Sequence, residues 1–299
     1  MNSTQTGAPT TPNADSRTMR ALQGHALYGD DFTQPEIDGW FADEREGYFN
    51  LYFRDAPAAP ASQDAYTYAA LAEQHGFRWL GQRQYAHALG IGSANGAELR
   101  PVLARSDRVT VLEPSEGFAT TEVDGKPVAY VKPQASGLMP FDSESFDLVI
   151  CFSVLHHIPN VSTVIREMHR VLKPGGHVLL REPTHSMGDW RRPRRGLTKN
   201  ERGIPIEVFR SILRNSGLKV LYETRCMFSL TPRLERLIGR PVWTVPWIVK
   251  ADAWLCRLPV WSHSYHAESV WQKFRPISVA YVLEKPVAPW VRSPAQDRA

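Results

Sequence analysis

Short apolar runs alternate with amphipathic stretches through the middle of the chain. Almost every position from Phe146 to Phe152 is apolar, which is typical of a strand buried on both faces. From Val161 to Leu172 the apolar residues recur at helical spacing, with charged residues turned outward. This alternation predicts an α/β fold with a doubly wound parallel sheet. We expect strands at Tyr85–Leu89, Val109–Glu113, Pro127–Val131, Phe146–Phe152 and His177–Glu182.

Proline and glycine mark where the predicted helices begin and end. Pro35 suits the first turn of a helix, with Thr33 as its cap, and a second helix covers about Ala65–His75. Residues 173–176, Lys-Pro-Gly-Gly, end the helix that begins at Val161. After them we expect a helix at Ile206–Asn215 and strands at Leu218–Tyr222 and Ile277–Leu283.

These elements divide the chain into segments of different character. We expect a disordered tail at 1–20, an N-terminal helical lid at 21–84, a core at 85–222 with an arginine-rich loop at 186–203, a Trp-rich cap insertion at 223–276, the last core strand at 277–285 and a C-terminal tail at 286–299. The pattern shows no signal peptide and no run of the ~20 apolar residues that a membrane span needs. Cys151, Cys226 and Cys256 have neither disulfide nor metal spacing. We therefore expect a cytoplasmic protein with free thiols and no bound metal. The sequence makes no prediction of its oligomeric state.

A glycine turn stands at the centre of the predicted core. Residues 85–96 form a short apolar strand that breaks into Gly90-Ile91-Gly92 and opens a helix. Such a turn lets the backbone approach a ligand, while the helix points free N–H groups at it. Glu113 ends the next apolar run, 23 residues after Gly90, where a carboxylate suits a ribose diol. The predicted ligand is a nucleoside.

A nicotinamide dinucleotide is the main alternative ligand for this turn. Its fingerprint is G-x-G-x-x-G. Here Gly90 and Gly92 are followed by Gly96, one residue too late for that pattern. The spacing therefore disfavours a dinucleotide.

Four segments occur in a specific order between about residues 85 and 185. They are Leu89-Gly90-Ile91-Gly92, then Glu113-Pro114, then Met139-Pro140-Phe141 with Ser145–Val149, and finally Val154–Ile158 leading to Arg170–Gly176. This set resembles the class I S-adenosylmethionine-dependent methyltransferases, in particular their small-molecule type 11 branch. The resemblance implies a Rossmann-like sheet of seven strands whose last strand, here Ile277–Leu283, is antiparallel. It implies S-adenosylmethionine as cofactor, bound by Gly90, Gly92 and Glu113 with contributions from Ser93, Pro114, Ser136 and Cys151.

The chain departs from that family around the turn. The family usually carries an acidic residue two positions before the first glycine, where this chain has Ala88, and its third glycine is replaced by Ala94. A second family acid would fall near Ser136, and Pro101 interrupts the helix after the turn. We expect backbone and hydroxyl contacts there instead. The departures also motivate a different hypothesis, a non-catalytic protein that binds S-adenosylmethionine.

Candidate catalytic side chains follow the fourth and fifth predicted strands. His156 and His157 come just after one strand and Glu182 ends the next, so all three belong to the same edge of the sheet. Histidine titrates near neutrality and can remove a proton from a hydroxyl during methyl transfer. One of the pair would act as base, and Glu182 would orient it or bind acceptor. In the alternative interpretation, at least one histidine packs under the following helix.

Positive charge concentrates in the loop after the fifth strand. Residues 191–202 hold five arginines and one lysine against one glutamate, a net charge of +5 in a chain of net +4. Guanidinium groups suit phosphate or carboxylate, so we expect Arg191 and Arg195, with His185 and Trp190, to contact an anionic acceptor. A solvated basic loop is the alternative, and nucleic acid is disfavoured because few aromatic residues are interleaved. The predicted reaction is O-methylation of a small or glycan-like acceptor, such as a sugar, nucleotide sugar or lipid-linked glycan, with N- or C-methylation as the alternative.

The insertion is rich in tryptophan. Its members are Trp243, Trp247, Trp254, Trp261 and Trp271. Spacings of four and seven put the first four near one helical stripe, although Pro246 and Pro259 prevent a single helix. Such a stripe predicts the core of a cap. The alternative is peripheral membrane contact, with Lys250, Arg240 and Arg257 nearby.

Overall fold

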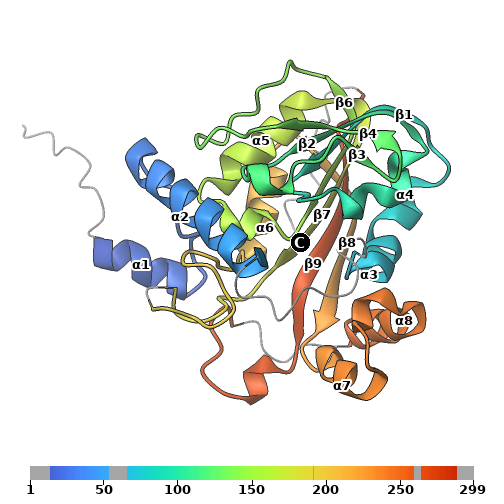
Figure 1. The fold of residues 1–299 in the computed structure, drawn as a ribbon. Coiled ribbons are helices and arrows are strands. Elements are labelled where there is room, and N and C mark those ends of the chain that lie inside the picture. The colour runs from blue at the N-terminus through green and yellow to red at the C-terminus, as the bar shows by residue number, and fades with distance from the viewer. Residues whose placement is uncertain (1–13, 54–65, 191, 259–263, 288–299) are drawn as a thin grey trace, which may run out of the picture.

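A seven-stranded sheet runs through the molecule, with helices on both of its faces (Figure 1). The computed structural model describes residues 14–53, 66–190, 192–258 and 264–287. The strand order is β5-β2-β1-β6-β7-β9-β8. These strands are β1 (Tyr85–Ile91), β2 (Ser106–Leu112), β5 (Ala129–Val131), β6 (Phe146–Phe152), β7 (Leu172–Pro183), β8 (Lys219–Phe228) and β9 (Pro276–Glu284), while β3 (Glu122–Val123) pairs with β4 (Lys126–Pro127).

The last strand is antiparallel to both of its neighbours. β9 lies between β7 and β8, and Tyr281 faces Leu180 on one side and Glu223 on the other. The strands β5, β2, β1, β6 and β7 pair in parallel. The predicted α/β architecture, a Rossmann-like sheet of seven strands with the last one antiparallel, is confirmed.

The observed strand ends differ most from the predicted ones at the edge of the sheet. β6 has the predicted limits, whereas β8 continues past the predicted end at Tyr222 to Phe228. The extension contains Glu223, Thr224 and Arg225, polar residues that look like the start of a loop. An edge strand pairs on one side only and lies partly in water, so it tolerates polar side chains that a central strand would not.

Helices after β1 cover the two faces of the sheet. α5 (Val161–Val171) buries Val164, Ile165 and Met168 in the main core. The helix α6 (Ile206–Arg214) contacts α5. After β1 the chain forms a 3-10 turn at Ala97–Leu99 and the short helix α4 (Arg100–Leu103). Pro101 lies in the first turn of α4, where its missing N–H breaks no helical hydrogen bond.

Before β1 the chain forms α1 (Ala14–Leu22), α2 (Gln34–Phe53) and α3 (Ala69–His75), with a 3-10 turn at Phe77–Leu80. α1 begins inside the segment 1–20, which composition alone assigns to a disordered tail. The helix is held by tertiary contacts, because Arg17 pairs with Asp31 and Ala21 packs in a cluster with Trp190. Such contacts leave no mark in local composition.

The insertion between β8 and β9 packs beside the sheet, against α3 and β8 (Figure 1). It contains α7 (Glu235–Ile238), α8 (Pro246–Leu255) and 3-10 turns at Thr231–Leu234, Val242–Thr244 and Trp271–Lys273. Trp243 and Val249 are buried in a cluster with Leu71 of α3 and Cys226 of β8. Among the described residues, no helix combines the length and the apolar character that crossing a bilayer requires.

Candidate active site

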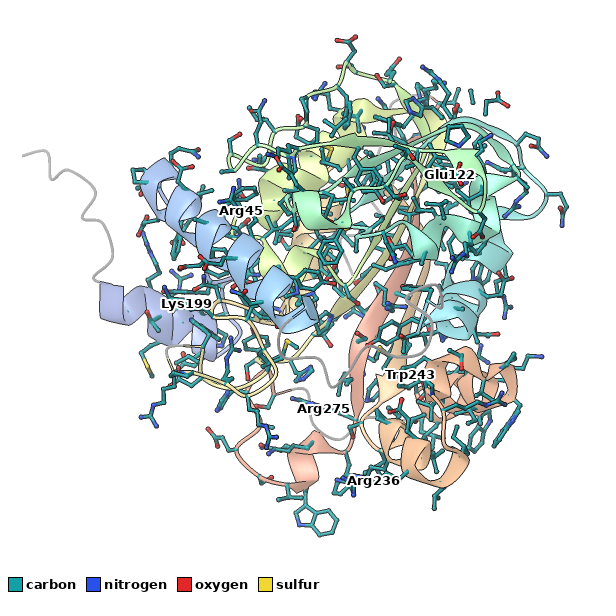
Figure 2. The ribbon with its side chains drawn as sticks, viewed as in Figure 1. Arg45, Glu122, Lys199, Arg236, Trp243 and Arg275 are labelled. Carbon is teal, nitrogen blue, oxygen red and sulfur yellow. The ribbon has the colours of Figure 1, made fainter. Side chains whose placement is uncertain are left out.

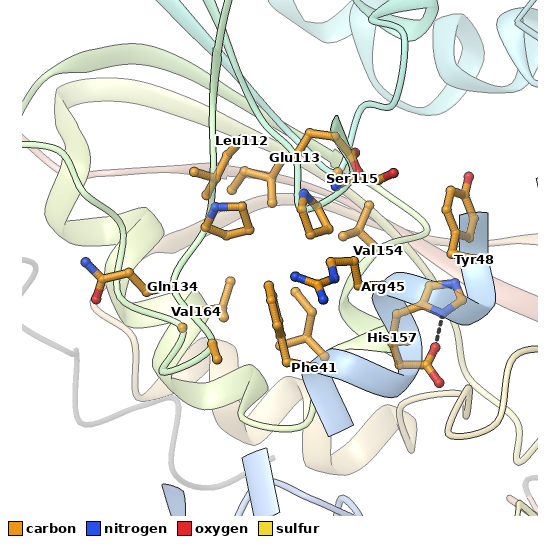
Figure 3. A pocket seen from close by; sticks show the side chains of 18 of the residues that line it. Phe41, Arg45, Tyr48, Leu112, Glu113, Ser115, Gln134, Val154, His157 and Val164 are labelled. Atoms are coloured by element: carbon orange, nitrogen blue, oxygen red, sulfur yellow. Dashed lines mark hydrogen bonds and ion pairs between the residues drawn. The ribbon is translucent and has the colours of Figure 1, made fainter. Parts of the chain in front are cut away.

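A pocket opens at the carboxyl ends of β1, β2 and β6, with α2 along one side (Figure 3). This is the point where the strand order of the sheet reverses, and ligands of doubly wound folds bind there. Much of its wall is apolar and includes Leu112, Pro114, Leu138, Met139 and Val154. Such a wall suits a flat, largely apolar ring.

The turn after β1 has room for glycine alone at two positions. Gly92 lines the pocket with φ +61°, and a Cβ atom there would come within 2.6 Å of Val154. A Cβ on Gly90, just behind, would meet Leu99 at 2.9 Å. Ala94 takes a positive φ of 44° in place of the third family glycine, and its carbonyl accepts a hydrogen bond from Tyr130. The turn therefore keeps its shape without that glycine.

Glu113 brings a buried carboxylate to the pocket. Its oxygens accept hydrogen bonds from the backbone N–H groups of Ala94 (3.2 Å) and Ser115 (3.0 Å), which tie it to the glycine turn. Burial raises its pKa above the usual range. Each carboxylate oxygen has a second acceptor position, so the group can also receive ribose hydroxyls. The glycine cradle, the apolar wall and this carboxylate fit the nucleoside part of S-adenosylmethionine.

The other residues predicted to hold the cofactor lie at different depths. Pro114 lines the pocket directly, and Ser136 lies between two lining residues, Ala135 and Gly137. Ser93 is buried beside the turn and donates to Glu98. Cys151 is fully buried in the main core, so its side chain is not part of the wall.

Helix α2 supplies pocket residues that the sequence analysis missed. Phe41, Glu44, Arg45 and Tyr48 recur at helical spacing, so they share one face, and all four line the pocket. Arg45 points into the pocket (Figure 3). The spacing was visible in the sequence, but only the packing of α2 against the sheet edge shows that this face borders a ligand site.

His157 lines the pocket opposite the glycine turn and is paired with Glu44 of α2. Its Nδ1 lies 2.8 Å from the Glu44 carboxylate (Figure 3). Glu44 also accepts hydrogen bonds from the Thr198 hydroxyl and the Asn200 N–H. The backbone carbonyl of His157 accepts the indole N–H of Trp40 at 2.7 Å. Glu44 thus orients the ring, and Trp40 holds the backbone of His157 at the pocket wall.

His156, one residue earlier, is buried between two carboxylates. Its Nδ1 lies 2.7 Å from Glu182 and its Nε2 lies 3.6 Å from Glu201. Burial alone would lower the pKa of this ring, but the hydrogen bonds and charges of Glu182 and Glu201 outweigh burial and raise the pKa to about 9. At neutral pH His156 is therefore a buried imidazolium, unable to accept another proton.

Glu182 holds the turn that carries both histidines. It is fully buried and accepts hydrogen bonds from the backbone N–H groups of Val154 (2.9 Å), Leu155 (2.8 Å) and His156 (3.3 Å). It does not line the pocket. Its contacts are those of a positioning residue.

The cluster of His156, His157 and Glu201 also has ligand atoms within 4.8 Å of one another, a spacing that a metal ion could share. In the described residues, however, each of these side chains already has a hydrogen-bonding partner. The proton on His156 offsets part of the negative charge. The absence of a bound metal, expected from the sequence, stays a prediction.

The arginine-rich loop divides into buried and exposed members. The Arg202 guanidinium is buried and donates to the carbonyls of His156 (3.0 Å) and Ile158 (2.9 Å), while stacking on Trp40. Arg194 donates to carbonyls of its own loop, including that of Thr198. Arg192 and Arg195 are exposed, and Arg191 falls outside the described residues. Much of the positive charge therefore closes the loop onto the histidine turn.

His185 and Trp190, both predicted to touch the acceptor, lie outside the pocket wall. Trp190 is buried in a small cluster with Ala21 and Tyr265. Burial lowers the pKa of His185 to about 4, so the ring is neutral at physiological pH, and its Nδ1 lies 3.2 Å from the carbonyl of Ile277. Trp190 thus packs the loop against α1, and His185 contacts β9.

The fold and the pocket describe an α/β domain whose pocket is lined by the glycine turn on one side and by a histidine–glutamate pair on another. Residues 89–180 match a family model described as "Methyltransferase domain". The matched segment is thus similar to the methyltransferase domain that the ordered motifs between residues 85 and 185 predict.

Two curated relatives share part of this region. The phthiotriol/phenolphthiotriol dimycocerosates methyltransferase 1 of Mycobacterium ulcerans is 32% identical over 118 residues, 37% of this chain and 42% of that protein. The ubiquinone biosynthesis O-methyltransferase of Pseudomonas syringae pv. tomato is 34% identical over 95 residues, 30% of this chain and 41% of that protein. The chain spans less than half of the length of these relatives.

Among solved structures, the [4+2]-cyclase SpnF is similar, with a TM-score of 0.50 at 15% identity, covering 82% of this chain and 97% of that chain. A similarity at this identity shows the fold alone. Because that protein is named as a cyclase, the activity of the present chain has to be argued from its site.

The buried imidazolium predicts how stability depends on pH. The folded pKa of His156, about 9, lies above the unfolded value of 6.5, so its stabilisation is complete below pH 6.5 and is lost as pH rises through 9. This pKa difference between the folded and unfolded states corresponds to on the order of 3 kcal/mol of folding free energy. In thermal melts, the gap between wild type and His156→Gln should be large at pH 6 and should narrow above pH 9. A gap independent of pH would mean that His156 is not charged in the folded protein.

Proposed function

We propose that this protein transfers a methyl group from S-adenosylmethionine to an oxygen of a small or glycan-like acceptor that carries an anionic group. The observation that carries the proposal is the pocket, which joins Gly92 and Glu113 to His157 and Glu44. The methyltransferase domain match and the O-methyltransferase named among the relatives support it. A sugar, a nucleotide sugar or a lipid-linked glycan would supply both the oxygen and the charge.

In this proposal the turn after β1 binds the cofactor. Gly90 and Gly92 admit it to the backbone, Glu113 receives its ribose hydroxyls and Pro114 borders its adenine. Ser93, Ser136 and Cys151 would support the surrounding loops. When bound, S-adenosylmethionine supplies a methyl group on a positively charged sulfur. The pocket aligns acceptor and methyl group, which by itself supplies a large share of the rate enhancement.

His157 is the proposed general base. When Nδ1–H of its ring donates to Glu44, the lone pair resides on Nε2, which can accept the proton of an acceptor hydroxyl. His156, already protonated and enclosed, would serve with Glu182 to position the turn. The assignment thus divides the two histidines into one base and one structural cation.

Arg45 is the proposed contact for an anionic group on the acceptor. It points into the pocket from the face of α2 that also carries Glu44 (Figure 3). The predicted contacts Arg195, His185 and Trp190 are not in the described wall, and the position of Arg191 is not described. Arg195 is exposed and would act at longer range. Arg45 is exposed as well, but it borders the pocket and Arg195 does not, so Arg45 can contact a phosphate or carboxylate there directly.

The outer face of α8 is the proposed peripheral membrane contact. Trp247 and Trp254 are each 65% exposed, seven residues apart on one helical face, whereas Trp243 is buried. Lys250 lies between them on that face and Arg257 follows, both exposed. Tryptophan beside basic residues matches an interface with anionic lipids. The free, buried cysteines accord with the proposed cytoplasmic location.

The proposed methyl transfer to oxygen can be tested directly. Incubation with labelled S-adenosylmethionine and a fractionated extract should yield a product labelled on oxygen. Replacing the base in His157→Ala should lower turnover by about a hundredfold or more. The affinity for S-adenosylhomocysteine, measured by calorimetry, should change little.

His25→Ala removes an exposed histidine and is the matched control, expected to keep full turnover. A label found on nitrogen or carbon would show N-methylation or C-methylation in place of O-methylation. Tight S-adenosylhomocysteine binding without any labelled product would favour a non-catalytic binding protein. Unchanged turnover in His157→Ala would remove the base from the mechanism.

The second prediction concerns the charge of the acceptor. Arg45→Met should raise KM by about threefold to tenfold with little change in kcat, because Arg45 borders the pocket but is exposed, and a charge-assisted hydrogen bond partly screened by solvent contributes less than a buried one. Added salt should raise the KM of the wild type. Arg195→Met should have a smaller effect. If Arg195→Met has the larger effect, the arginine-rich loop recognises the anionic group. If KM responds to neither substitution nor to added salt, the acceptor is neutral.

The third prediction concerns α8. Vesicles that contain phosphatidylglycerol should retain the protein in flotation, and pure phosphatidylcholine vesicles should retain less. The double substitution Trp247→Ser, Trp254→Ser should abolish retention, whereas Trp271→Ser, at another exposed tryptophan, should not. If neither the wild type nor the Trp271→Ser control floats with the vesicles, membrane contact is excluded.

A further inference from the structure

A buried arginine at the end of β7 lacks an ionic partner among the described residues. Arg181 is 2% exposed, and its Nη2 donates to the hydroxyls of Tyr66 (3.2 Å) and Ser153 (3.3 Å). Its Nε and Nη1 have no hydrogen-bond acceptor in the described parts of the chain. The rings of Tyr68 and Phe152 lie 4.7 and 5.2 Å from its guanidinium carbon. These rings shield the charge but accept no N–H hydrogen bond in their planes.

Such an arrangement is costly unless an anion completes it. A buried charge needs a counter-charge and acceptors for its donors, and an arginine always remains charged. Arg202, the other fully buried arginine named above, shows the alternative, because backbone carbonyls receive its N–H groups. Arg181 has no comparable set. Its open nitrogens, Nε and Nη1, lie on different edges of the guanidinium, so each can donate one charge-assisted hydrogen bond to a carboxylate oxygen.

Arg181 stands directly behind the wall of the pocket. Ser153, which its guanidinium contacts, lines the pocket together with Gly92. The turns after β1 and β6 touch, since a Cβ on Gly92 would meet Val154. An extension of a bound nucleoside past Gly92 and Ser153 would therefore reach the guanidinium.

A buried carboxylate lies on the glycine-turn side of the same region. Glu98 is 6% exposed and accepts the hydroxyl of Ser93, the residue after Gly92, at 2.5 Å. Burial raises the pKa of Glu98 to about 7, although the hydroxyl of Ser93 and the positive charge of Arg181 favour its ionised form. Glu98 is therefore only partly ionised at neutral pH until a cation joins it, and an α-ammonium group beside it would favour its charged form.

We propose that Arg181 binds the α-carboxylate and Glu98 the α-ammonium of the methionine part of S-adenosylmethionine. This inference rests on the proposed function and specifies which residues hold the amino acid end. Glu98 would supply, from the helix side of the turn, the carboxylate that the family usually carries at the position of Ala88. Arg181 and Glu98 would then serve in binding, with the reacting atoms left to the other end of the pocket.

Titration calorimetry with two ligands tests the assignment without any turnover. S-adenosylhomocysteine carries the amino acid end, and 5′-methylthioadenosine has the same nucleoside but ends after the sulfur. Arg181→Met should weaken S-adenosylhomocysteine about thirtyfold, the loss of a charge-assisted pair, and leave 5′-methylthioadenosine within about threefold. Glu98→Gln should show the same selectivity with a smaller loss.

Arg275→Met is the matched control, because it also removes a largely buried guanidinium, in a segment outside the pocket (Figure 2). It should alter neither affinity. Equal weakening of both ligands in Arg181→Met and Glu98→Gln would make these residues structural and overturn the proposal, as would unchanged affinity for S-adenosylhomocysteine. If Arg181→Met does not fold, Glu98→Gln decides alone. A wild type that binds neither ligand would instead refute the proposed function.

Discussion

The buried carboxylate of Glu182 sets the geometry on which the candidate site depends. It accepts three consecutive backbone N–H groups and the ring of His156, so the turn after β6 has one shape. Arg202 holds the carbonyls on the other side of that turn. Because each of these groups is buried, releasing one would leave an unsatisfied donor or acceptor. The positions of His157 and Ser153 at the pocket follow from this clamp.

Identical residue types acquire different chemistry within this frame. His156 lies between two carboxylates and is held as a cation, whereas His157 reaches the pocket and pairs with Glu44. Arg202 is saturated by carbonyls, Arg181 keeps open nitrogens and Arg45 points into the pocket. Burial and partners, which depend on distant segments, decide what each side chain can do. Net positive charge in the loop is thus a poor guide to where an anion binds.

The fold leaves the choice of reaction to the site. A methyltransferase domain match and a structural likeness to a cyclase concern the same kind of α/β sheet. In this chain, α2 contributes one wall of the pocket through Phe41, Glu44, Arg45 and Tyr48. The insertion, in contrast, packs on α3 and β8, and its described residues line no part of the pocket.

The sequence by itself determined the sheet, the glycine turn and the acidic end of β2, because apolar periodicity and glycine placement are local signals. It placed His156, His157 and Glu182 at one edge, since parallel strands bring their carboxyl ends together. Only the tertiary structure separated His157, at the pocket, from the enclosed His156, brought α2 to the pocket, placed Trp190 in a core cluster and extended β8 beyond Tyr222. Those outcomes depend on contacts between segments far apart in the chain, such as Glu44 with His157, and no local pattern encodes such a contact.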